Sequence, residues 1–326
     1  MEPFLELEQK FATWVGVDPT GMVGCSSGTA ALHLALEALR LPKGAEVIMP
    51  DLTMVACTRA VSLAGLTPVF VDCGEDLLME KTLIPQALEL KTKALMAVHV
   101  YGRGYGMEPP GFSPGSFYFI EDLAEAHGIK PHSMTDIACW SFYRNKIIAG
   151  EEGGAVWFRD SEHAKLARSL RSMGFTDAHD FMHLPGGHNY RMSNAHAKLI
   201  LDSLARADEN IRQRRQMEAR YDLHCPDEWR MPRRDAVWVY DLRIPGMTKE
   251  FQDGLVRGLQ AEGIAARHCF KPMHMQEEYK DCKHVGGEVA ERMSREVIYL
   301  PVSPTMTEGD AVWAVAAVKR IGFGIK

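Results

Sequence analysis

The stretch from Gly44 to Asp72, GAEVIMPDLTMVACTRAVSLAGLTPVFVD, decides the fold class of this chain. It contains two short apolar runs, Glu46 to Met49 and Pro68 to Val71, on either side of a segment, Thr53 to Ala64, with helical spacing of its apolar residues. A helix that joins two apolar strands is typical of a parallel strand pair. The stretch therefore predicts an α/β fold.

The same alternation of strands and helices continues on both sides of this stretch. The predicted helices are Glu6 to Val17, Gly28 to Leu39 and Ile84 to Leu90, and the predicted strands are Ala94 to Val100, Phe117 to Ile120, Ile137 to Phe142 and Gly154 to Phe158. Strands that alternate with helices favour a mainly parallel sheet covered on both faces. Three prolines and several glycines between Val100 and Phe117 predict a loop there.

A smaller unit is expected towards the C-terminus. A long helical stretch from Ser193 to Asp222 leads into it, followed by a strand, a helix, a strand and a helix at Val237 to Arg243, Lys249 to Glu262, Val297 to Leu300 and Glu308 to Ile321. We expect a large domain over residues 1–210 and a small α+β domain over residues 211–326.

Composition and charge narrow the class of protein. The chain is 46% hydrophobic and carries 43 acidic against 37 basic residues, a formal charge of -6. No basic stretch resembles a nucleic-acid footprint, and Arg212, Arg214 and Arg215 are interpreted as a solvated helix face beside acidic residues. We therefore expect no nucleic-acid partner.

The cysteines and the apolar segments bear on the cellular compartment. Seven cysteines form no CxxC pair, which favours reduced thiols and a cytoplasmic protein over a disulfide framework. Met1 to Trp14 lacks the pattern of a signal peptide, and Ala311 to Val318 is too short to span a bilayer. We expect neither secretion nor a membrane partner.

Three short segments carry the residues that could do chemistry. The first is Ser26 to Leu32, SSGTAAL, where small residues open a helix. Unpaired N–H groups and the positive end of the helix dipole can bind a phosphate there. The alternative is a plain helix cap by Ser26 or Ser27.

The second segment is Ile120-Glu121-Asp122, an acidic pair at the end of an apolar strand. Parallel-sheet enzymes bind ligands at the carboxyl ends of their strands. A carboxylate at that edge can hold a pyridine nitrogen in its protonated form, which makes the ring an electron sink. The alternative, a helix cap by Asp122, remains open.

The third segment is Ser141 to Lys146, SFYRNK, which precedes the glycine-rich turn Gly150 to Gly154. A lysine at the edge of a sheet can be partly desolvated, and its amine can then form a Schiff base. A surface lysine before a hairpin is the alternative.

The order of these segments decides between the alternatives. A phosphate site, a carboxylate at a strand end and then a lysine before a glycine-rich turn follow one another as in fold-type I, aspartate-aminotransferase-like enzymes that use pyridoxal 5'-phosphate. From about Phe4 to Ile321 the chain resembles the DegT/DnrJ/EryC1/StrS family of sugar aminotransferases, and its perosamine-synthase-like branch most closely. The resemblance rests on SGTAAL (27–32), GAEVIMP (44–50), PVFVD (68–72), HVYG (99–102), EDLAEAHG (121–128), SFYRNKIIAGEEGG (141–154), NYRMS (189–193) and KPMHMQ (271–276).

The resemblance implies a role for each matching residue. Lys146 would form the Schiff base and move a proton, and Asp122 would hold the pyridinium. The phosphate would be bound by Ser27, Gly28, Thr29 and Ser141, with Asn189 reaching over from a second subunit of a homodimer. Glu125 would lie near the ring oxygen and Met54 over the ring; the residues nearest the substrate would be Tyr190, Arg191 and His274.

The implied reaction takes an amino group from L-glutamate, through pyridoxamine 5'-phosphate, to a nucleotide-linked 4-keto-6-deoxy sugar. The chain departs from the family pattern at Met54, where relatives carry an aromatic residue, and in a shortened N-terminal arm. The identity of the keto acceptor stays open. So do two other functions: a sugar dehydratase, which has histidine in place of the lysine, and a non-catalytic protein of the same fold.

Three histidines suggest a metal site, because His179 and His183 are four residues apart and His188 follows. Pro185, Gly186 and Gly187 interrupt any helix in this segment, and no carboxylate or cysteine near it completes a ligand set. The sequence therefore predicts an irregular loop and no metal.

Overall fold

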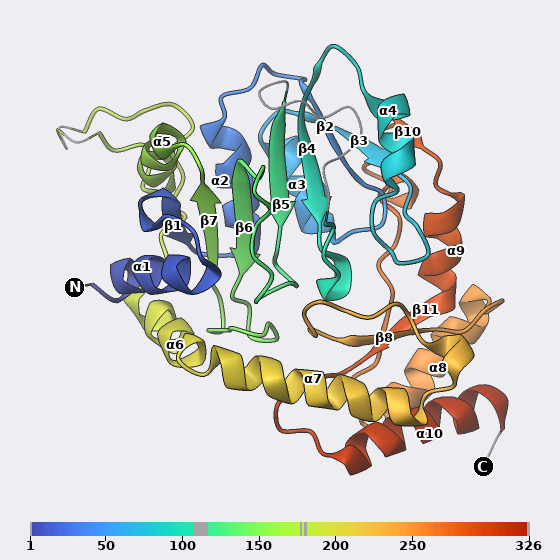
Figure 1. Ribbon diagram of the computed structural model, residues 1–326. Helices are drawn as coiled ribbons and strands as arrows, with labels where there is room; N and C mark the ends of the chain where they lie inside the picture. The colour runs from blue at the N-terminus through green and yellow to red at the C-terminus, as the bar shows by residue number, and fades with distance from the viewer. Residues whose placement is uncertain (1, 107–116, 177, 179–180, 325–326) are drawn as a thin grey trace.

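The computed structural model describes residues 2–106, 117–176, 178 and 181–324. An eight-stranded sheet forms the centre of the larger part (Figure 1), in the order β1-β7-β6-β5-β4-β2-β3-β10. The strands are β1 (Met22–Cys25), β2 (Glu46–Pro50), β3 (Thr67–Val71), β4 (Thr92–Val98), β5 (Tyr118–Asp122), β6 (Ile137–Ser141), β7 (Gly154–Phe158) and β10 (His284–Val285). Strand β7 runs antiparallel to β1 and β6, and the other pairs are parallel, so the predicted mainly parallel sheet is confirmed.

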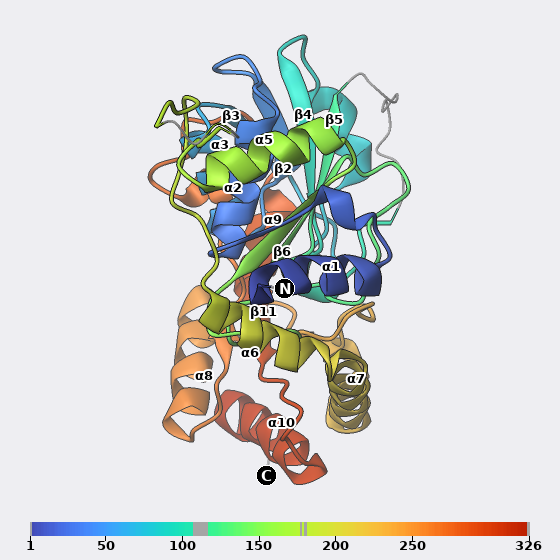
Figure 2. The same ribbon diagram turned by 90° about the vertical axis from the view of Figure 1, so that its left-hand side faces the viewer.

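Both faces of this sheet are buried. Along β2, Val47 and Met49 pack into one hydrophobic cluster and Ile48 into another, as the alternation of side chains along a strand requires. Figure 2 shows α2 and α3 together on one side of the sheet. The helices of the larger part are α1 (Pro3–Val15), α2 (Gly28–Ala38), α3 (Val55–Leu63), α4 (Ile84–Ala87), α5 (Ser161–Arg171), α6 (Asn194–Leu204) and α9 (Glu288–Glu296).

A second, smaller core lies at the end of the molecule that carries the C-terminus. There a three-stranded antiparallel sheet has the order β8-β11-β9, with β8 (Tyr240–Arg243), β9 (Arg267–His268) and β11 (Val297–Leu300). It packs with α7 (Ala207–His224), α8 (Lys249–Ala261) and α10 (Glu308–Phe323). Figure 1 shows α7 running below the large sheet, with α10 beneath it.

The limits of the two domains are not sharp in the chain. Helix α7 continues through residue 210, and β10 brings residues 284–285 back to the large sheet beside β3. The division into 1–210 and 211–326 therefore stays a prediction.

Several elements differ from their predicted extent. The helix expected at Ile84 to Leu90 ends at Ala87, because the Thr92 hydroxyl accepts a hydrogen bond from the Glu89 N–H and forms a turn. The stretch from Ser193 to Asp222 is divided between α6 and α7. Residues 107–116 of the predicted loop lie outside the described residues.

The interpretation of the arginine run as a solvated face is wrong for Arg214. This side chain is buried, and its Nη1 donates to the carbonyl oxygens of Trp238 and Val302, each at 2.9 Å. Arg212 is exposed and pairs with Glu209, as expected of a surface residue. Arg215 is partly buried and donates to the carbonyl oxygens of Arg234 and Asp235, so two arginines of the run tie α7 to other segments.

All seven cysteines are described, and all are free thiols, as the sequence predicted. Within the described residues, no helix has the length and apolar character that crossing a bilayer requires.

Candidate active site

Three chain segments meet at one edge of the large sheet. Strands β5 and β6 are parallel and end there at Asp122 and Ser141. Because β1 and β6 both run antiparallel to β7, β1 ends at the same edge, and α2 begins just after it. The segments enclose a cavity of about 340 Å³. Its lining residues are Ser27, Gly28, Thr29, Leu32, Met54, Ala56, Val98, Asp122, Ala124, Glu125, Ser141, Tyr143, Asn145, Lys146, Glu152, Trp238, Phe270 and Tyr299.

The start of α2 forms one end of this cavity. The Ser27 hydroxyl caps the helix by accepting a hydrogen bond from the Ala30 N–H at 3.1 Å, so the helix-cap interpretation is confirmed. The N–H groups of Gly28 and Thr29 open the first turn and have no acceptor within the helix. A methyl group at Gly28 would lie 2.7 Å from the Cβ of Ser141, which shows how closely the helix start approaches β6.

Asp122 forms the floor of the cavity. Its Oδ1 accepts a hydrogen bond from the Ala124 N–H at 2.9 Å, and its Oδ2 accepts one from the Cys57 thiol at 3.0 Å. The neighbouring Glu121 faces the opposite side of the sheet, where its Oε1 lies 2.9 Å from His99 Nε2. Of the acidic pair, only Asp122 lines the cavity.

Lys146 is a nearly buried lysine, with 11% of its side chain exposed. Its Nζ lies 3.9 Å from the centre of the Trp238 ring and 3.6 Å from Oε1 of Glu125. Burial lowers the pKa of Lys146, and the Glu125 carboxylate partly opposes that effect. The alternative of a surface lysine is wrong. A desolvated amine of this kind has more of its neutral, nucleophilic form available near neutral pH.

Glu125 is held in place by a strained loop. Its Oε2 accepts a hydrogen bond from the Tyr101 N–H at 2.9 Å, and Tyr101 has a left-handed backbone with φ of 52°. Burial raises the pKa of Glu125 to about 7, although Lys146 lowers it in part. Two titratable groups with shifted pKa values in one cavity are typical of an active site.

Comparison with known proteins assigns the family. The sequence pattern described as the DegT/DnrJ/EryC1/StrS aminotransferase family matches residues 2–319. The chain belongs to this family. It is 32% identical to a GDP-perosamine synthase of Caulobacter vibrioides, over 97% of this chain and 89% of that protein, and also 32% identical to one of Escherichia coli O157:H7, with the same two shares. The crystal structure of S. venezuelae DesV superimposes with a TM-score of 0.85, at 28% identity, over 99% of this chain and 90% of that one.

Membership of the DegT/DnrJ/EryC1/StrS family makes the chain an aminotransferase with the fold that the sequence predicted. The cavity then contains eight of the predicted site residues, and their roles stay predictions. These residues are Ser27, Gly28, Thr29, Met54, Asp122, Glu125, Ser141 and Lys146.

Four other residues that the family resemblance singled out do not line the cavity. Asn189 is exposed, and its Oδ1 lies 3.3 Å from the Nη2 of Arg191, which is also exposed. The Tyr190 hydroxyl lies 3.1 Å from Nδ1 of His33. His274 pairs through Nδ1 with Asp51, at 2.6 Å.

Tyr143 of the cavity was not predicted as a site residue, and neither were three further aromatic residues, Trp238, Phe270 and Tyr299. The last three come from the C-terminal part of the chain, where each looks like an ordinary core residue of a short strand or loop. The Cys57 thiol that donates to Asp122 was also missed. A cysteine three residues after Met54 gives no sign in the sequence that it faces Asp122.

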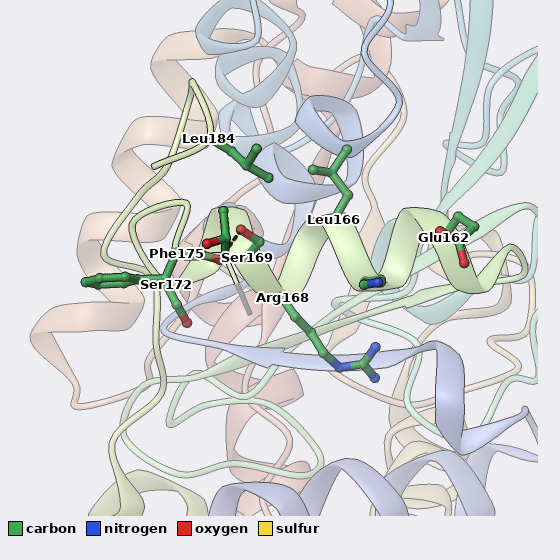
Figure 3. Close-up of a pocket in the computed structure, with 9 residues that line it drawn as sticks. Glu162, Leu166, Arg168, Ser169, Ser172, Phe175 and Leu184 are labelled. Carbon is green, nitrogen blue, oxygen red and sulfur yellow. Dashed lines mark hydrogen bonds between the residues drawn. The ribbon is translucent and has the colours of Figure 1, made fainter. Parts of the chain in front are cut away.

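A second hollow contains none of the predicted site residues. Figure 3 shows it between α5 and the segment that follows, with a volume of about 500 Å³. Two of its polar side chains are already engaged: Arg168 donates to the carbonyl oxygens of Thr20 and Met22, and the Ser169 hydroxyl donates to that of Phe175. We therefore assign the family's chemistry to the first cavity.

Proposed function

We propose that this aminotransferase uses pyridoxal phosphate to move an amino group from L-glutamate to a nucleotide-linked keto sugar, specifically a 4-keto-6-deoxy sugar. The observation that carries the proposal is the buried Lys146 amine, which shares one cavity with Asp122 and the start of α2. The names of the relatives support the substrate class: two GDP-perosamine synthases at 32% identity and a dTDP-3-amino-3,4,6-trideoxy-alpha-D-glucose transaminase at 31%.

The residues of the cavity fit the cofactor. A phosphate needs N–H donors, and the first turn of α2 supplies them beside the Ser141 hydroxyl. The absence of a side chain at Gly28 keeps that space open. A pyridine nitrogen needs a carboxylate, and Asp122 lines the cavity. When bound, pyridoxal phosphate supplies a carbonyl carbon for imine formation and a ring that withdraws electrons.

The side chains of this protein would then divide the work. Asp122 would keep a proton on the ring nitrogen, since a carboxylate stabilises the adjacent positive charge. The Lys146 amine would accept a proton from the substrate carbon and return it, because its lowered pKa suits both steps. Trp238 and Tyr299 would restrict the access of water to that amine.

We also propose a cytoplasmic homodimer in which Asn189 of each chain completes the phosphate site of the other. Asn189 is exposed and does not line the cavity of its own chain, which supports a role across an interface. Of the alternatives, the dehydratase is disfavoured because position 146 is a lysine.

The test follows the first half of the reaction, with L-glutamate, by absorption spectroscopy. Protein loaded with pyridoxal phosphate is titrated with L-glutamate in the absence of any acceptor. The proposal predicts loss of the visible absorption of the loaded protein and release of stoichiometric 2-oxoglutarate. D-glutamate is the matched control. Loaded protein whose spectrum does not respond to L-glutamate would contradict the proposed donor.

A further inference from the structure

A second group of potential ligands lies outside the cavity, on the far part of α2. His33 and Glu37 are four residues apart, so one helix face presents both side chains. His188 approaches them from the segment that follows α5. The imidazole nitrogens and the carboxylate oxygen that the three residues offer lie within 4.8 Å of one another.

One ring nitrogen of each histidine in this cluster lacks a hydrogen bond. Nε2 of His33 and Nε2 of His188 are both buried, and neither has a hydrogen bond among the described residues. His33 itself is only 3% exposed, and its Nε2 lies 3.5 Å from Oε1 of Glu37. Leaving two buried polar atoms without a partner is costly, so the arrangement calls for something that satisfies both.

Neighbouring groups orient the two rings for a ligand at Nε2. The Tyr190 hydroxyl lies 3.1 Å from Nδ1 of His33, so that nitrogen can donate its proton and leave the lone pair on Nε2. The His188 ring stacks on Tyr190 at 4.7 Å with an angle of 14° between the planes.

Contrary to the sequence-based prediction of no metal, we propose that His33, Glu37 and His188 bind a divalent transition-metal ion of the zinc type. Two imidazoles and one carboxylate suit zinc, whereas calcium and magnesium prefer oxygen ligands alone. Zinc–ligand bonds of about 2 Å place tetrahedral ligand atoms about 3.3 Å apart, close to the spacing of His33 and Glu37. His188 must move closer by side-chain rotation, and the fourth position is free for water.

The consequence of this site would be structural. The ion would join α2, whose first turn opens the cavity, to the segment that continues into Asn189. That segment is already attached to α5 through the hydrogen bond from the His188 N–H to the Leu170 carbonyl. The metal would add a direct link between this segment and α2 and would leave the residues of the cavity unchanged.

The experiment uses the full chain after removal of metals with a chelator, and zinc chloride alone as the probe. Competition against a chromophoric chelator gives the affinity, and elemental analysis gives the stoichiometry. We expect one zinc per chain. Glu37→Gln and His188→Gln each remove a ligand, so zinc affinity should fall by more than tenfold, since even outer-shell partners change it by about 10- to 100-fold.

Two control variants separate this site from adventitious binding. His183→Gln removes the nearby histidine whose Nδ1 contacts the Met173 carbonyl and which is not part of the cluster. Cys282→Ser removes the least buried thiol. Both should retain the zinc affinity of the wild type.

Two results would overturn the proposal. One is a wild-type protein that binds no zinc at micromolar concentrations, which would mean that a proton satisfies the cluster instead. The other is a folded Glu37→Gln variant with unchanged affinity. Glu37 is partly exposed, so this variant decides the question even if His188→Gln fails to fold.

Discussion

Lys146 is the residue on which the proposed chemistry depends. Its amine lies over the ring of Trp238 and 3.6 Å from Oε1 of Glu125. We expect Lys146→Ala to fold and to lose turnover together with the visible absorption of the loaded protein, because only the nucleophilic amine is removed. Circular dichroism checks the fold, and a glutamate assay checks turnover. Normal turnover in this variant would exclude Lys146 from the mechanism.

The raised pKa of Glu125 predicts that the stability of the protein depends on pH. Its pKa in the folded protein is about 7, above the ordinary 4.5. Between pH 4.5 and about pH 7 the Glu125 carboxyl loses its proton in the unfolded chain and keeps it in the folded chain. This carboxyl therefore contributes stability at low pH that is lost as the pH rises to about 7. Glu125→Gln removes the effect.

The measurement is urea unfolding of cofactor-free wild type and Glu125→Gln at pH 5 and pH 8. Between pH 5 and pH 8 the wild type should lose about 2 to 3 kcal/mol of unfolding free energy that the variant keeps. This follows from about 1.4 kcal/mol for each unit by which the pKa is raised. Parallel pH dependences of the two proteins would mean that Glu125 is ionised throughout this range.

Individual site residues could be predicted where they lie at the start or the end of a helix, strand or turn that the sequence shows. Asp122 ends a strand, Ser27 opens a helix and Lys146 precedes a glycine-rich turn, and all three line one cavity. Cys57 could not be predicted, because only the fold brings its thiol within 3.0 Å of Asp122. Arg214 was misjudged because two carbonyl groups distant in sequence bury it.

At the scale of elements, the contact between α2 and β6 determines the space for a phosphate. A methyl group at Gly28 would be 2.7 Å from the Cβ of Ser141. Overpacking of this kind costs about 1 to 3 kcal/mol, and relief of the clash would push the helix start away from the strand. We expect Gly28→Ala to weaken retention of pyridoxal phosphate by about tenfold or more, at about 1.4 kcal/mol per factor of ten.

A matched control is Gly254→Ala in α8, where an added methyl group meets no atom within 4 Å. This variant should retain the cofactor as well as the wild type, which equilibrium dialysis can measure. If both variants behave alike, the close approach of α2 to β6 does not control the phosphate site.

Strands were easier to predict than the ends of helices. The strands of the parallel sheet are apolar on both faces, so their sequences stand out. The end of α4 depends instead on a single hydrogen bond to the Thr92 hydroxyl, which the spacing of apolar residues does not report. The aromatic wall of the cavity depends on how the C-terminal strands pack, and that is a property of the tertiary structure.

At the scale of the whole molecule, the prediction concerns two chains. If Asn189 of one chain completes the site of the other, Asn189→Ala should lose a hydrogen bond to a charged phosphate, worth about 1.5 to 3 kcal/mol. Mixing Asn189→Ala protein with Lys146→Ala protein should restore activity on subunit exchange, since a mixed dimer has one site with both defects and one with neither. Each variant alone is the control. A mixture that stays inactive despite proven exchange would exclude the shared site.

The most direct test of the account is a product measurement. The loaded protein is incubated with heavy-nitrogen L-glutamate and, one at a time, with 4-keto-6-deoxy sugars linked to guanosine, uridine and thymidine nucleotides. Mass spectrometry then follows each sugar. The proposed function predicts that at least one of them exchanges its keto oxygen for a labelled amino group, and that Lys146→Ala protein gives no labelled sugar. Loaded protein that releases 2-oxoglutarate from glutamate and yet labels no nucleotide sugar would contradict the proposed acceptor.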